Sequence, residues 1–123
     1  MSFNQDLIIA YRLPNIIVRA QITDICAKAS QPVEFVNDVT QLEALIAESS
    51  RSILIICDLA EIASGFQEME ILTRLRKAGR IQIMGRYPHV ETGLRDLAKS
   101  QGIDYVVPNS GFAKRLQDLL RGG

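Results

Sequence analysis

The sequence predicts an α/β protein in which five strands and five helices alternate and form one parallel sheet covered by helices on both faces. Short, continuous apolar runs bounded by turn residues recur along the chain, as expected for strands buried in a parallel sheet. Between them, apolar residues recur with the period of a helix. Since 123 residues suffice for one core, we expect one stand-alone domain spanning residues 1–123.

Each predicted strand is a β-branched or aromatic segment of four to eight residues. The five segments cover residues 6–11, 32–36, 52–59, 81–87 and 104–107. The third, "SILIICDL", is the most apolar, so we expect it in the middle of the sheet.

The first two predicted helices cover residues 15–29 and 40–49. Pro14 favours the start of the first, and its apolar residues spread round more of the helix than one buried face needs. We therefore expect Val18 or Ile22 to be exposed and to offer a contact for self-association. The second helix is predicted to open with a capping box, "TQLE", formed by Thr40 and Glu43.

Apolar spacing predicts the buried faces of the other three helices. The helix over 66–78 buries Phe66, Met69, Leu72 and Leu75; the next buries Val90, Leu94, Leu97 and Ala98 and stops at Gly102; the last, capped by Ser110, buries Phe112, Leu116, Leu119 and Leu120.

Composition excludes several classes of protein. Fourteen basic residues balance fourteen acidic ones, which argues against general electrostatic binding to nucleic acid or to a membrane surface. The first residues resemble neither a signal peptide nor a membrane span. Cys26 and Cys57 lie inside apolar runs and are predicted to be buried, unpaired thiols. We expect a cytoplasmic protein.

Functional groups of an open parallel sheet gather at the carboxyl ends of its strands. One carboxylate, Asp58, and two arginines, Arg12 and Arg86, fall there. The other residues at these ends are Tyr11, Gly85, Tyr87, Pro108, Asn109 and Ser110.

Two segments carry a family resemblance: "LIICDLAE", which ends its apolar run on Asp58, and "GIDYVV", which contains Tyr105. With the chain length and strand order, they resemble the receiver domain of response regulators in two-component signalling. The resemblance implies a flavodoxin-like (βα)5 three-layer sandwich with strand order 2-1-3-4-5. It places Asp58 at the phosphoacceptor position and Tyr105 at the aromatic switch position.

Other positions depart from the receiver pattern. Where receivers carry an acidic pair that holds Mg²⁺, this chain has Tyr11 and Arg12; Gly85 replaces Thr or Ser, and Pro108, followed by Asn109, replaces Lys. Phosphoryl transfer depends on metal ions and cations that neutralise charge. We therefore expect a degenerate pseudo-receiver that is not an enzyme, holds no metal or cofactor, and keeps Asp58 as a vestigial phosphoacceptor.

Two alternatives remain open. Asp58 could still accept a phosphoryl group, or Arg12 and Arg86 could together bind a small anion or nucleotide, although no glycine-rich phosphate loop follows the first strand. If neither holds, Asp58 is predicted to pair with Arg86, Arg12 or backbone N–H groups at the strand end.

If the chain neither accepts a phosphoryl group nor binds an anion, we expect its function to depend on a protein-binding surface. The resemblance implies that the fourth helix, fifth strand and last helix form the surface that binds a protein partner or a second copy. It would present Glu91, Arg95, Lys99, Tyr105, Lys114, Gln117 and Arg121. Tyr105 is expected either to lie half-buried against the fourth helix or to anchor a contact.

Overall fold

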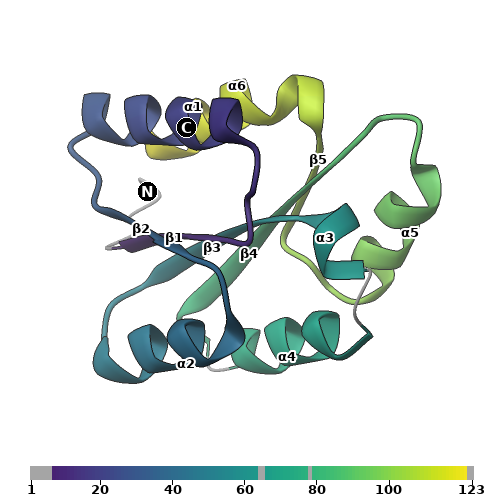
Figure 1. Ribbon diagram of the computed structural model, residues 1–123, viewed down its shortest axis with the longest axis horizontal. Coiled ribbons are helices and arrows are strands. Elements are labelled where there is room, and N and C mark those ends of the chain that lie inside the picture. The colour runs from purple at the N-terminus through teal and green to yellow at the C-terminus, as the bar shows by residue number, and fades with distance from the viewer. Residues whose placement is uncertain (1–6, 64–65, 78, 122–123) are drawn as a thin grey trace.

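A computed structural model describes residues 7–63, 66–77 and 79–121, except the side chains of residues 66 and 67. Its centre is a parallel five-stranded sheet of order β2-β1-β3-β4-β5, so the predicted flavodoxin-like topology is confirmed and the apolar third strand is central (Figure 1). The strands are β1 (Leu7–Tyr11), β2 (Val33–Val36), β3 (Ile53–Asp58), β4 (Ile81–Tyr87) and β5 (Tyr105–Pro108).

Helices cover both faces of the sheet and complete three layers (Figure 1). One face packs against α1 (Ile16–Lys28) and α6 (Phe112–Leu120), which follows a 3-10 turn, η1 (Asn109–Gly111). The other face packs against α2 (Val39–Glu48), α4 (Phe66–Arg76), α5 (Thr92–Ser100) and the short α3 (Leu59–Ala63). Helix α3, which begins directly after β3, was not predicted from the sequence.

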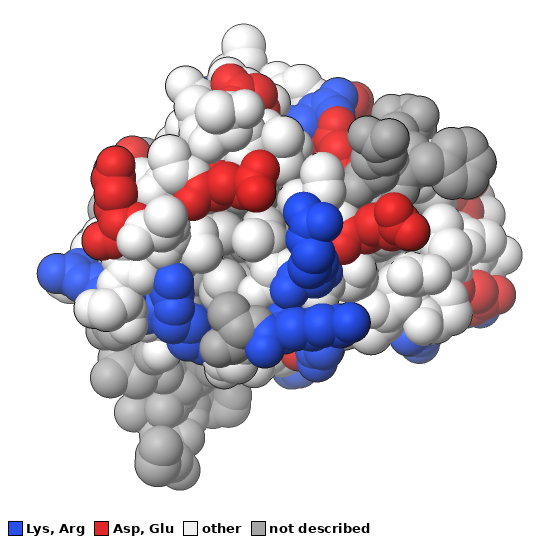
Figure 2. Space-filling model, turned by 90° about the horizontal axis from the view of Figure 1, so that it is seen from below, with Lys and Arg blue, Asp and Glu red and all other residues white. Residues whose placement is uncertain are grey.

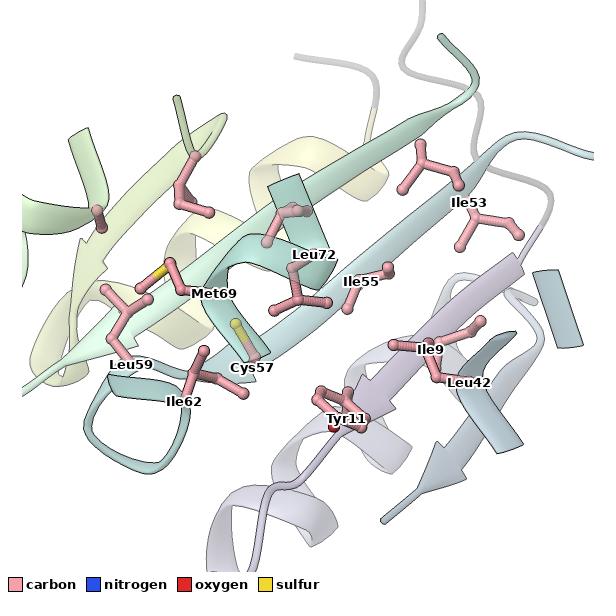
Figure 3. Packing of buried hydrophobic residues seen from close by; sticks show 14 of the residues in the cluster. Ile9, Tyr11, Leu42, Ile53, Ile55, Cys57, Leu59, Ile62, Met69 and Leu72 are labelled. Atoms are coloured by element: carbon pink, nitrogen blue, oxygen red, sulfur yellow. The ribbon is translucent and has the colours of Figure 1, made fainter. Parts of the chain in front are cut away.

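Strand alternation divides the core into two apolar clusters. Ile9, Ile55 and Ile83 face the α2–α4 side, where Leu42, Leu59 and Leu72 pack against them (Figure 3). Ile8, Leu54 and Met84 face α1 and α6. Cys26 and Cys57 are buried and unpaired, as predicted. No helix in the described part of the chain is long and apolar enough to cross a membrane.

Two predicted helix caps are wrong. α2 begins at Val39, because Asp38 has an extended backbone and its Oδ1 accepts a hydrogen bond from the Gln41 N–H at 2.9 Å. Asp38 is thus the N-cap, and Thr40 lies inside the helix. Ser110 lies within η1, and α6 begins two residues later without a side-chain cap.

The exposed residues of α1 also differ from the prediction. Val18 and Ile22 are buried because α1 packs against α6 as well as the sheet, whereas Ile16 and Ile17 are 80% and 72% exposed. Self-association through Val18 or Ile22 therefore has no basis in the structure.

The buried faces of α4 and α5 agree with the sequence only in part. Met69, Leu72 and Ala98 are buried, but Leu97 is exposed on α5, and Val90 is exposed because the Glu91 N–H bonds the Pro88 carbonyl in a turn that precedes the helix. The predicted inward position of Phe66 lies outside the described side chains.

Candidate functional site

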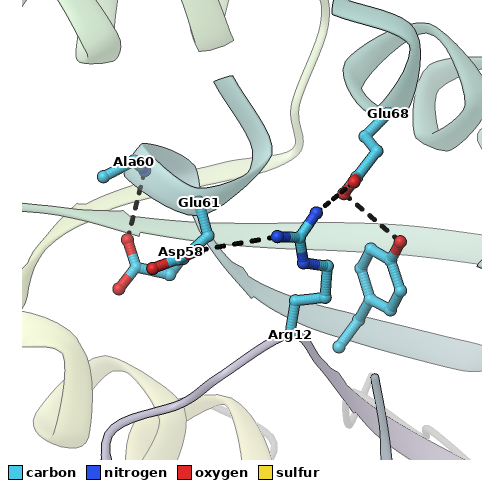
Figure 4. A network of polar contacts seen from close by, with 6 residues as sticks. Arg12, Asp58, Ala60, Glu61 and Glu68 are labelled. Atoms are coloured by element: carbon cyan, nitrogen blue, oxygen red, sulfur yellow. Dashed lines mark hydrogen bonds and ion pairs between the residues drawn. The ribbon is translucent and has the colours of Figure 1, made fainter. Parts of the chain in front are cut away.

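Asp58 ends the central strand and faces an arginine on the neighbouring strand. The register pairs Asp58 with Arg86 of β4, and Arg86 Nη1 lies 3.5 Å from Asp58 Oδ2. The other carboxylate oxygen, Oδ1, accepts a hydrogen bond from the Ala60 N–H at 3.1 Å (Figure 4). The carboxylate is thus held by a cation and by the backbone of the first turn of α3.

Arg86 is a buried cation with few contacts that stabilise its charge. Only 8% of the residue is exposed, and its guanidinium lies over the Phe112 ring, 5.3 Å from the centroid. Its Nε has no hydrogen-bond partner within the described part of the chain. Burial lowers the pKa of Arg86, while the neighbouring Asp58 carboxylate opposes this shift. Asp58 is therefore the main counter-charge of a poorly solvated arginine.

Arg12 does not join this pair. It follows β1 with a left-handed backbone (φ 51°), and its guanidinium bonds the Glu68 carboxylate of α4. Its Nη2 lies 3.6 Å from Oε2 of Glu61 on α3 (Figure 4). Of the predicted partners of Asp58, Arg12 is thus wrong, because helices that follow β3 bring two further carboxylates to this end of the sheet.

Tyr11 completes the Arg12 network. It is 1% exposed, and its hydroxyl donates a hydrogen bond to Glu68 Oε2 at 3.3 Å. Burial, with the nearby Glu68 carboxylate, raises the pKa of Tyr11 to about 12, so the hydroxyl stays protonated and acts as a donor. Neither Glu61 nor Glu68 was predicted from the sequence as a site residue. Glu61 lies within three residues of Asp58, but no spacing signal links Glu68 to this site.

The space beside Gly85 is filled by a packed side chain, and glycine itself has no hydroxyl group. The register places it opposite Cys57, so it faces the other side of the sheet from Asp58. A Cβ added there would lie 2.5 Å from Leu59 Cδ2 and 2.7 Å from its Cγ. The resemblance assigned the Thr or Ser position to Gly85, but the residue that lies opposite Asp58 is Arg86.

Pro108 and Asn109 take no part in the Asp58 contacts. Pro108 ends β5 opposite Tyr87, and Asn109 is exposed at the start of η1. Within the described residues, the polar contacts of Asp58 run to Arg86 and Ala60. The structure thus separates the pocket residues into an Asp58–Arg86 pair and a Tyr11–Arg12–Glu61–Glu68 network.

Comparison with known proteins identifies the architecture. No protein-family model matches the chain. No curated protein matches it either. Among solved structures, the chain resembles a signal receiver domain of a two-component signal transduction histidine kinase from Clostridium thermocellum. The TM-score is 0.65 at 14% sequence identity, over 96% of this chain and 95% of the other.

The chain has the receiver fold.

In this receiver fold, the residues around Asp58 do not fit Mg²⁺. The ion needs several oxygen ligands in octahedral geometry. Asp58 faces Arg86, and Glu61 and Glu68 face Arg12. Among the described residues, no three His, Cys, Asp or Glu side chains are grouped so that they could hold a metal ion. The same pairing lowers the positive charge that an anion would meet at Arg12 and Arg86.

The predicted partner surface of the receiver fold spans one edge of the sheet, where β5 lies between α5 and α6 (Figure 1). Glu91, Lys99, Lys114, Gln117 and Arg121 are exposed there, and Arg95 and Tyr105 are half-buried. Tyr105 packs on the α6 side, with the Arg115 guanidinium 5.4 Å from its ring centroid, rather than against α5 as expected. Its alternation with Val106, which packs on the α5 side, explains the difference.

Proposed function

We propose that this protein is a pseudo-receiver, a signalling module that acts through protein–protein contacts without phosphorylation of Asp58. The observation that carries the proposal is the Asp58–Arg86 pair. In place of a switchable charge at the end of the central strand, the chain has a carboxylate with a permanent cation from β4.

Electrostatics favour a permanent pair. Two unit charges 3.5 Å apart attract by about 5 kcal/mol at an effective dielectric constant near 20, before desolvation is subtracted. Arg86 is buried, and the strand and Phe112 restrict its side chain, so forming the pair with Asp58 costs little further conformational entropy. Removing Asp58 as a partner would leave a buried charge uncompensated, which is costly.

The surroundings of the pair also support a role that is not enzymatic. Phosphoryl transfer depends on positioning and on neutralising charge, which metal ions and cations normally supply. Arg12 occupies the place of a metal-binding acid in the family pattern and is itself held by Glu68. Leu59 fills the space beside Gly85. We therefore assign no catalytic residue and no cofactor.

The partner surface in this proposal is the edge formed by α5, β5 and α6. Its charges are mixed and partly satisfied within the surface: Arg95 lies 3.1 Å from Asp96, and Lys114 lies 3.5 Å from Asp118. Such a surface suits a protein partner or a second copy of the chain better than a polyanion, which would require a continuous basic patch.

Intact-mass spectrometry tests the proposal. The purified protein is incubated with Mg²⁺ and acetyl phosphate, beside the Asp58→Ala variant and an active receiver domain that shows the reagent is competent. We expect a phosphoryl adduct on the active receiver and on neither form of this chain. An adduct on the wild type that Asp58→Ala lacks would refute the pseudo-receiver assignment and restore Asp58 as a phosphoacceptor.

A further inference from the structure

The edge of the sheet opposite β5 is formed by β2, whose outer side is open. β2 pairs with β1 alone among the described strands. The Pro32 and Val36 carbonyls accept hydrogen bonds from the N–H groups of Ile8 and Arg12, so they face β1. Because backbone groups alternate in direction along a strand, the N–H and C=O groups of Val33 and Phe35 point outward. Such an edge can pair with another strand.

A shallow groove runs along α2, beside β2 in its first half and beside Leu7 and Arg51 in its second. It consists of two adjoining hollows of about 270 and 340 Å³ that share Leu45 and Glu48. Leu7, Val36, Ala44 and Leu45 supply its apolar lining, Glu34 and Glu48 supply carboxylates, and Arg51 supplies one guanidinium at the end of the second hollow. The half beside β2 thus offers apolar contact and negative charge next to backbone groups that pair with no described strand.

The segment that forms β2 and α2 carries charge of one sign, and Arg51, which lines the far end of the groove, lies just beyond it. Residues 29–50 contain no lysine or arginine. Their acidic residues, Glu34, Asp38, Glu43 and Glu48, are all exposed. Figure 2 views the side of the molecule covered by α2 and α4; acidic side chains lie in its upper left part, over the half that contains α2, and basic side chains lie below them. The part of the groove lined by β2 and the middle of α2 is therefore locally acidic in a neutral protein.

We infer that the β2–α2 edge binds an extended, basic segment of a partner protein, which adds a strand to β2. Outward backbone groups of Val33 and Phe35 would pair with the segment, as in other cases of strand addition. Alternate side chains of an extended segment point to the same face, so apolar residues and Lys or Arg can face the groove together. The site lies at the opposite edge from the α5–β5–α6 surface and does not depend on the proposed function.

The test uses a capped peptide, Lys-Thr-Val-Thr-Lys-Thr-Val-Thr-Lys, which puts lysine and valine on one face when extended. It is titrated into the isotope-labelled chain, and binding is followed by chemical-shift changes. We expect saturable shifts confined to β2, α2 and the segments beside them, and weaker binding as salt is added. A matched peptide with glutamate in place of lysine should not bind.

Variants of the chain test each part of the inference. Combined Glu34→Lys and Glu48→Lys should weaken peptide binding by about tenfold or more, since like charges then face each other. Val33→Pro removes an outward N–H without removing a bond to β1, and should also weaken binding. Glu70→Lys makes the same type of charge change at an exposed position of α4 that lines neither hollow, and should leave the affinity unchanged.

Three results would overturn binding at this edge, and a fourth would overturn strand addition. The three are the absence of saturable binding, shifts centred away from β2 and α2, and unchanged affinity in the Glu34→Lys, Glu48→Lys variant. The first is the result expected if Glu34 only keeps the edges of two sheets from joining. Binding that is lost in this charge variant but kept in Val33→Pro would refute strand addition.

Discussion

Replacing Gly85 with alanine should strain the packing beside Asp58. The added Cβ would lie 2.5 Å from Leu59 Cδ2, well inside ordinary van der Waals contact. Leu59 is fully buried at the start of α3, packed in the cluster that includes Ile62 and Met69 (Figure 3). Its side chain therefore has no open space into which it can move.

The expected cost follows from this geometry. Overpacking a well-filled core costs about 1–3 kcal/mol, so Gly85→Ala should lower the free energy of unfolding by that amount. Leu59→Ala should cost about 2–5 kcal/mol, because it deletes a buried side chain. In the Leu59→Ala variant, the side-chain atoms that a Cβ at residue 85 would meet are absent. In that background, Gly85→Ala should therefore cost less than about 0.5 kcal/mol, which is near the error of additivity.

Urea unfolding of the two single variants and the double variant measures this coupling. Gly93→Ala in α5 is the matched control, since a Cβ at that position meets nothing within 4 Å. It should stabilise the protein by about 0.5–1 kcal/mol through helix propensity. If Gly85→Ala is as harmless as the control, or costs the same in both backgrounds, the close approach of Leu59 does not explain the glycine.

Three further outcomes follow from the site. Arg12→Gly should be about 1–2 kcal/mol more stable to urea than Arg12→Ala, because both lose the ion pairs and only alanine resists the left-handed backbone; equal stabilities would contradict this. Because the pKa of Tyr11 is higher in the folded chain, its protonated hydroxyl stabilises the fold fully below pH 10. This stabilisation is lost as the pH rises towards about 12. Between pH 10 and 12, the free energy of unfolding from urea titrations should fall by up to about 3 kcal/mol more in the wild type than in Tyr11→Phe. Equal falls in the two proteins would refute the raised pKa of Tyr11. Cys57 should resist a thiol reagent until urea unfolds the chain, since burial raises its pKa to about 12; a fast native reaction would contradict its burial.

The fold could be predicted from the sequence because its signals are local. Apolar runs such as residues 53–57 have to be buried on both sides, and helical spacing between them leaves a parallel sheet as the consistent arrangement. Strand β4 was predicted to the residue, because its apolar residues lie between two turn signals, Gly79 before the strand and Pro88 after it. Helix ends were less certain, since a cap depends on which of several polar residues adopts an extended backbone, as with Asp38 and Thr40.

The partners of the site residues were decided by the tertiary structure. The sequence alone was enough to place Asp58, Arg12 and Arg86 at one end of a parallel sheet, because strand ends can be read from apolar runs. It did not determine which arginine faces Asp58, because that depends on the register between β3 and β4 and on where α3 and α4 place Glu61 and Glu68. Residues far apart in sequence meet only after the helices pack, and packing has no local signal. The sheet follows from patterns of hydrophobicity, and the charge pairs follow from the three-dimensional arrangement of the elements around it.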